Sequence, residues 1–175
     1  MAGIRLAHKD FIISKDVTNT LQFDNIFSQR FSMYEILGHN LKSSYGQQRD
    51  WLNMTLLGAD GSVLSGTDYY SHYNYIHSNG TTKYAGNEAG VSDWRFARHT
   101  EDSFGTNFRA VIHTPYESNR ITSFQNTVSS NNSSNLHFFE TTGVYRNNTS
   151  ITGFRLFGET YEVVGGNISV FGIGG

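Results

Sequence analysis

The sequence contains no cysteine and only one proline, Pro115. Without cysteine the chain has neither disulfides nor thiolate metal ligands, so buried side chains or association must stabilise it. With a single proline, no Pro-rich linker divides the 175 residues. These absences argue against a small disulfide-stabilised scaffold. They favour a single domain, which at this length buries roughly 70% of its unfolded surface.

Charged residues and long apolar runs are also scarce. Asp, Glu, Lys and Arg make up 16% of the chain, and the formal net charge is -2. The absence of a basic stripe argues against nucleic acid or an anionic membrane as a partner. No segment approaches the ~20 apolar residues of a membrane span, and the N-terminus lacks the apolar run of a signal peptide. We therefore expect a protein that is soluble as made, with no nucleic-acid partner and no membrane partner.

Aromatic residues and glycines are abundant instead, with 14% aromatics and 18 glycines. This combination favours strands and turns over helices. Side chains alternate with a period of two in Val17–Phe23 and Asp68–His77, and turn signals such as Asp60-Gly61 separate such runs. Many short strands between regular turns are typical of a sandwich or barrel. The fold class that we predict is all-β, an antiparallel β-sandwich of jelly-roll type.

The turn signals give approximate limits for each strand. Ala85–Ser92 and Ser129–Asn135 carry no strand signal and are expected to be loops, and Asn25–Arg30 is the one segment in which a short helical turn is considered. The expected strands are Ala7–Ser14, Val17–Phe23, Phe31–Leu41, Arg49–Leu57, Asp68–His77, Trp94–Arg98, Asn107–His113, Arg120–Ser129, Val144–Tyr145, Ile151–Phe157 and Gly166–Ile173.

Three features follow one another along the chain: the segment Tyr34–Leu41, the hairpin Leu52–Leu64 followed by two tyrosines, and the C-terminal pair Ile151–Phe157 and Gly166–Ile173. Together they resemble small jelly-roll structural proteins of tailed bacteriophages. In such proteins the final strand commonly ends in an aromatic-Gly-Ile/Leu signature, similar to Phe171-Gly-Ile here. The resemblance covers residues 31–175, which we expect to form the jelly-roll domain. Residues 1–30 are expected to be an N-terminal arm or the opening strands.

The resemblance implies a structural role in a virion. Its first form is a capsid decoration or cement protein that lies on the capsid exterior and binds across major capsid subunits. The alternative is a carbohydrate-binding tail-fibre or receptor-binding module. Both kinds are usually trimeric, so the expected partners are other copies in a homotrimer, the major capsid protein or other virion proteins, and in the second form a surface glycan.

Two groups of apolar and aromatic residues are the candidates for contacts with a partner, one in the N-terminal arm and one on the strand Asp68–His77 with the nearby tryptophan. Alternating tyrosines could also stack on a sugar or fill the space between two sheets, and both interpretations stay open. The candidate interface residues are Ile4, Leu6, Phe11, Tyr69, Tyr73, Tyr75 and Trp94.

Catalytic patterns are missing from the sequence. The 7 histidines are scattered, with no spacing that places two imidazoles on one metal ion. Carboxylates for glycan hydrolysis are present, but none forms a recognisable pair. We therefore expect no catalytic residues, no metal site, no cofactor and no enzymatic activity, with a glycan hydrolase as the third option. The acidic candidates are Asp68, Glu88, Asp93, Glu101, Asp102, Glu140, Glu159 and Glu162.

Overall fold

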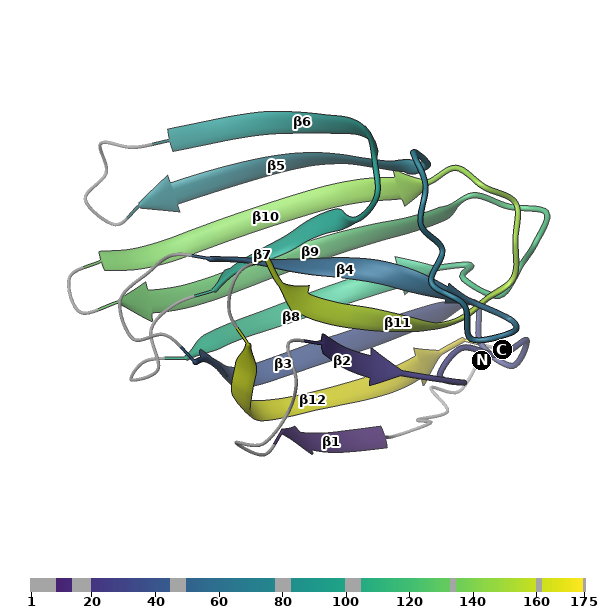
Figure 1. The fold of residues 1–175 in the computed structure, drawn as a ribbon, viewed down its shortest axis with the longest axis horizontal. Coiled ribbons are helices and arrows are strands. Elements are labelled where there is room, and N and C mark those ends of the chain that lie inside the picture. The colour runs from purple at the N-terminus through teal and green to yellow at the C-terminus, as the bar shows by residue number, and fades with distance from the viewer. Residues whose placement is uncertain are drawn as a thin grey trace.

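The computed structural model describes residues 9–13, 20–44, 50–77, 83–99, 105–132, 135–159 and 162–174. In these residues the chain is all-β, with twelve strands and no helix. Every strand pair is antiparallel, and the strands form two sheets that pack face to face (Figure 1). The expected antiparallel β-sandwich is therefore confirmed, and its architecture is compatible with a jelly roll.

The larger sheet has eight strands in the order β1-β12-β3-β8-β9-β10-β5-β6. Figure 1 shows β6 at its upper edge and β1 at its lower edge. Its strands, in chain order, are β1 (Lys9–Ile13), β3 (Met33–Ser43), β5 (Tyr69–His77), β6 (Lys83–Val91), β8 (Thr106–His113), β9 (Thr122–Asn132), β10 (Asn135–Tyr145) and β12 (Val163–Ile173).

The smaller sheet has four strands in the order β2-β11-β4-β7 and lies in front of the larger one in Figure 1. Its strands are β2 (Thr20–Phe23), β4 (Asp50–Gly58), β7 (Trp94–His99) and β11 (Ile151–Gly158). The N-terminal strands belong to both sheets, because β1 pairs with β12 whereas β2 pairs with β11. Both strands precede residue 24, and the described residues 24–30 that follow β2 are turns and irregular chain.

The core lies between the two sheets and is rich in aromatic rings. Strand β8 shows how the sequence produces it: Phe108, Ala110 and Ile112 point inward and are buried, while Asn107 and Arg109 point outward and are exposed. Ring contacts connect the two sheets. The ring centres of Trp94 on β7 and Phe124 on β9 are 4.2 Å apart, and those of Phe96 on β7 and Phe108 on β8 are 4.7 Å apart. Other fully buried side chains are Tyr34, Ile36, Leu41, Leu52, Met54, Phe139 and Phe154.

The structure differs from the secondary structure expected for three segments. Ala85–Ser92 is not a loop, since most of it belongs to strand β6. The described residues of Ser129–Asn135 are not a loop either, because β9 continues to Asn132 and β10 begins at Asn135. The expected strand Val144–Tyr145 is only the end of β10. Asn25–Arg30 contains turns and no helix. All these segments are rich in small or polar residues, which carry little periodic apolar signal.

Candidate functional site

Three of the expected interface residues lie in the core and offer no surface to a partner. Tyr69 and Trp94 have exposures of 0%, and Tyr75 has an exposure of 2%. The rings of Tyr69 and Trp94 meet edge to face at 5.2 Å between the sheets. These three residues therefore do not form the expected contact surface. The rings of Tyr69 and Tyr75 are also too deeply buried to stack on a sugar. The alternation of tyrosines along β5 fills the sandwich instead.

The hydroxyl of Tyr69 also makes two hydrogen bonds inside the protein. The hydroxyl accepts the backbone N–H of Leu56 at 3.0 Å and donates to the carbonyl of Leu64 at 2.7 Å. Both groups belong to β4 and the hairpin that follows it, so the buried phenol holds this hairpin against β5. Burial raises the pKa of Tyr69 well above its ordinary value.

The remaining candidates are scattered. Tyr73 is half-buried, and its ring lies 5.9 Å from that of Trp51 and 5.7 Å from that of Phe139. Phe11 lies in β1, opposite Ile168 of β12. Ile4 and Leu6 lie outside the described residues. Of the candidates whose side chains are described, the structure thus brings Tyr69 and Trp94 together in the core, and it leaves Tyr73 half-buried.

The outer face of β5 carries a different set of side chains, which point away from the smaller sheet because they alternate with the buried tyrosines. From one end to the other they are Tyr70, His72, Asn74 and Ile76. Their partners on β10, in register, are Val144, Thr142, Glu140 and Phe138. These four cross-strand pairs extend over about 20 Å along the strands. We call them the outer track.

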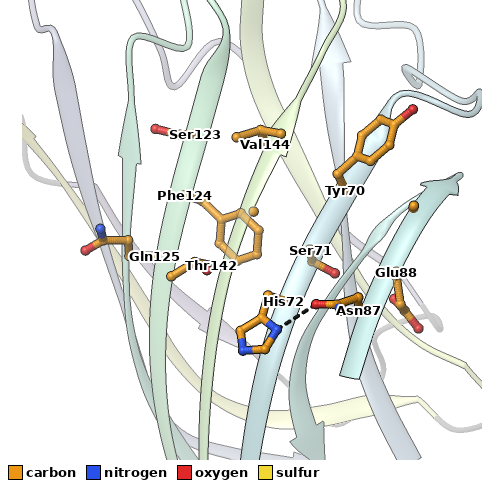
Figure 2. Close-up of a pocket in the computed structure, with 12 residues that line it drawn as sticks. Tyr70, Ser71, His72, Asn87, Glu88, Ser123, Phe124, Gln125, Thr142 and Val144 are labelled. Carbon is orange, nitrogen blue, oxygen red and sulfur yellow. Dashed lines mark hydrogen bonds between the residues drawn. The ribbon is translucent and has the colours of Figure 1, made fainter. Parts of the chain in front are cut away.

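A shallow hollow of about 470 Å³ lies over one half of the outer track. Figure 2 shows a polar contact at one end of it, where His72 of β5 and Asn87 of β6 point toward each other. The Nδ1 atom of His72 lies 2.7 Å from Oδ1 of Asn87, and both side chains are exposed. The residues that line the hollow are Tyr70, Ser71, His72, Asn87, Glu88, Ala89, Ser123, Phe124, Gln125, Thr142, Gly143 and Val144.

Gly143 of β10 is one of the residues that line the hollow. An added Cβ at this residue would lie 2.3 Å from Cε1 of Phe124 and 2.6 Å from the carbonyl oxygen of Tyr70. The Phe124 ring therefore occupies the space that a side chain would take, and it forms part of the lining between β9 and β10 (Figure 2). Gly143 lies between Thr142 and Val144, which point outward, so this Cβ would point inward, and the glycine makes room for the Phe124 ring on the core side of β10.

Apolar and aromatic groups stand at both ends of the outer track. At one end the guanidinium carbon of Arg146 lies 4.1 Å from the centre of the half-buried Tyr70 ring, a cation–π contact that fixes the ring. At the other end Ile76 and Phe138 are directly opposite each other, with exposures of 40% and 41%. These are two of the three large hydrophobic residues that are exposed in the described chain. The track is therefore apolar at its ends and polar between them.

Charge on the outer track is limited to one carboxylate. Glu140 is exposed and lies between Thr127 of β9 and Asn74 of β5. Glu88 points the other way, where its Oε1 lies 2.9 Å from Nε of Arg95 on β7. Over the described part of β5, β6, β9 and β10, no second carboxylate stands beside Glu140 on the outer face. No group of three or more His, Asp or Glu residues in the described ranges could hold a metal ion.

The sequence contained part of the signal for this face. Tyr70, His72, Asn74 and Ile76 share one face by period two, but periodicity does not say which face of β5 is covered by a second sheet. Asn87 was missed because β6 was expected to be a loop. The pairing of β5 with β6 brings Asn87 opposite His72.

No helix in the described residues is long and apolar enough to cross a membrane. No protein-family model matches the sequence, and no curated protein matches it. Among solved structures the chain is similar to an alginate lyase from Alteromonas sp.272, at 10% identity and a TM-score of 0.27, over 93% of this chain and 91% of that chain. A likeness at this score carries no argument about the activity of this chain.

Proposed function

We propose that the protein is a non-catalytic carbohydrate-binding module and that the outer track on the eight-stranded sheet is its binding surface. The observation that carries the proposal is the hollow itself, which has the hydrogen-bonded pair of His72 and Asn87 at one end and Tyr70 at the other. A volume of about 470 Å³ is within the range of small-molecule sites. The outer track continues along β5 and β10 beyond the hollow, so a chain of sugars could extend toward Ile76 and Phe138.

The side chains of the track suit sugar hydroxyls. His72, Asn87 and Gln125 are exposed and offer planar groups that both donate and accept hydrogen bonds. Because His72 and Asn87 already hold each other, less conformational entropy is lost when a ligand binds them. The Tyr70 ring and the exposed pair of Ile76 and Phe138 supply apolar surface for the faces of sugar rings.

Binding is favoured over hydrolysis on this surface. Glycoside hydrolysis requires two carboxyl groups on opposite sides of the scissile bond. Glu140 is placed beside an amide, Asn74, and not beside a second acid. The track can therefore hold a glycan through hydrogen bonds and apolar contacts, but its described residues offer no acid and base pair.

A carbohydrate-binding tail-fibre or receptor-binding module of a bacteriophage is the biological setting that fits this proposal. Such a module recognises glycans on the surface of its host. The capsid decoration role, in which the protein would bind the major capsid protein, makes no use of a hollow lined by His72 and Asn87. We therefore rank the receptor-binding role first among the virion roles that the resemblance implies.

A glycan array probed with the full chain tests the proposal. We expect selective binding to a glycan, with affinity reduced at least about tenfold in His72→Ala and in Asn87→Ala, since each substitution leaves polar groups of the site unpaired. The matched control is Gln22→Ala, an exposed amide on β2 of the other sheet, which should bind like the wild type. Absence of binding to any glycan, or equal binding by all three variants and the wild type, would overturn the proposal.

A further inference from the structure

The two sheets have four edge strands, and one of them differs from the others. The unpaired edge of a strand is a template for pairing with another chain, and proteins protect such edges by keeping them short, charged, bulged or covered. Strands β1 and β2 have five and four residues. Strand β6 has nine residues and, within the described chain, pairs with β5 alone. It is therefore the longest unpaired edge in the described chain.

The fourth edge strand, β7, is covered by the larger sheet. Thr141 of β10 donates its hydroxyl to the carbonyl of Arg95 at 3.4 Å, and Asn126 of β9 donates its amide to the carbonyl of Phe96. The indole of Trp94 donates to the carbonyl of Val144 at 3.3 Å. The first two contacts engage the carbonyl oxygens of two consecutive residues of β7.

Apart from Lys83 at its first position, β6 has no residue that offers comparable protection to its edge. From Ala85 to Ala89 it contains small residues, one amide and one acid, and it has no proline. Its acid, Glu88, is engaged with Arg95 of β7 on the inner side of the sheet. A register shift occurs only near the end of the strand, between the pairs of Tyr69 and Tyr70 with β6. The middle of β6 is thus regular and has no charged side chain pointing outward.

We propose that β6 pairs with β6 of a second copy of this chain in antiparallel orientation, which joins two eight-stranded sheets into one. A two-fold axis at Asn87 places Ala85 opposite Ala89 of the second copy and Gly86 opposite Glu88. An alanine or a glycine then stands in each of these two pairs. A two-fold axis at Glu88 would instead place the two carboxylates directly opposite each other, which is unfavourable. The sequence therefore favours the register centred on Asn87.

A second copy is the occupant that the strand fits best because β6 is complementary to itself. In a two-fold pair each copy satisfies the backbone groups of the other, and the contact closes without leaving a further free edge on either β6. Asn87 also lines the hollow, so the pairing would bring the hollows of the two copies to either side of the axis on one continuous outer face. The dimer would then present two binding surfaces to one target.

Sedimentation equilibrium of the full chain tests the pairing. We expect a species of twice the 19.7 kDa chain mass. Ala85→Lys with Ala89→Lys places like charges opposite each other twice in the dimer and should weaken it on the order of tenfold. Ala85→Lys with Ala89→Glu places opposite charges at the same pairs and should keep the dimer. Both positions are exposed, so neither double variant disturbs the core.

Two exposed positions on the central strand β9 provide the charge-matched control. Thr127→Lys with Ser129→Lys adds the same charge to the same sheet, and this variant should dimerise like the wild type. A wild-type monomer or trimer would overturn the proposal. So would a double variant Ala85→Lys with Ala89→Lys that dimerises as tightly as the wild type. Loss of the dimer in both β6 variants would overturn the register centred on Asn87.

Discussion

Asn126 of β9 donates its side-chain amide to the backbone carbonyl of Phe96, which lies on β7 in the opposite sheet. The β4–β7 pairing passes from Ala97 opposite Leu52 to Arg95 opposite Asn53, so Phe96 has no residue opposite it. Such a bulge leaves one residue outside the ladder. Asn126 is 4% exposed and therefore supplies, inside the core, the partner that the bulge requires.

The first prediction concerns this bond. Asn126→Ala should lower the free energy of unfolding by about 1–3 kcal/mol, because the buried carbonyl of Phe96 loses its donor. Asn126→Asp keeps the shape but replaces the donor with a carboxylate, and at neutral pH it should cost about 3 kcal/mol or more. Urea denaturation of both variants measures the effect. Gln125→Glu, the exposed neighbour, is the control and should change stability by less than about 0.5 kcal/mol.

The sequence predicted those strands in which apolar and polar residues alternate between two turn signals. In β8, Phe108, Ala110 and Ile112 mark the inner face directly. Strand β6 was not predictable in this way, since Ala85, Gly86 and Ala89 have neither bulk nor polarity to mark a face. Its strand conformation comes from pairing with β5, which is a tertiary effect.

The candidate site was predictable only in part, for a geometric reason. Tyr69 and Tyr70 are adjacent and similar, yet one is fully buried and the other lines the hollow. Alternation separates the two faces of β5, but only the position of the smaller sheet decides which face is covered. The contribution of Gly143 was also hidden, because it depends on the placement of the Phe124 ring on a neighbouring strand.

Trp94 should behave as a core residue and not as a contact residue. Trp94→Ala should lower the free energy of unfolding by about 3–5 kcal/mol, since a fully buried ring that packs on Tyr69 and Phe124 is removed. Chemical denaturation followed by circular dichroism measures this loss. Sedimentation of the folded variant should give the same oligomeric state as the wild type, and a stable but dissociated Trp94→Ala protein would contradict the core assignment.

Gly143 should tolerate no side chain. Gly143→Ala should destabilise the protein by about 1–3 kcal/mol, because the new methyl group would meet the Phe124 ring and the backbone of Tyr70. Gly165→Ala is the matched control, since the nearest atom to its added Cβ is Cδ of Lys42 at 3.7 Å. Thermal unfolding of the two variants should therefore separate them clearly. Equal stability of both would show that Phe124 moves away at little cost.

Glu88 should make the stability of the protein depend on pH. Burial raises the pKa of Glu88 above its ordinary value of 4.5, while the nearby Arg95 acts in the opposite direction. The folded state therefore holds the proton more tightly than the unfolded state, and the resulting stabilisation is present at low pH. It is lost as the pH rises through the raised pKa. Relative to Glu88→Gln, the wild type should thus become less stable between about pH 4 and about pH 7.

Urea denaturation of the wild type and the variant at both pH values measures this difference. Arg95→Gln sharpens the test, because removal of the guanidinium takes away the charge that opposes the effect of burial. The loss of stability with rising pH should be larger in Arg95→Gln than in the wild type, and it should disappear when Glu88→Gln is added. If the wild type instead gained stability over Glu88→Gln as the pH rose, the ion pair with Arg95 would outweigh the burial of the carboxylate.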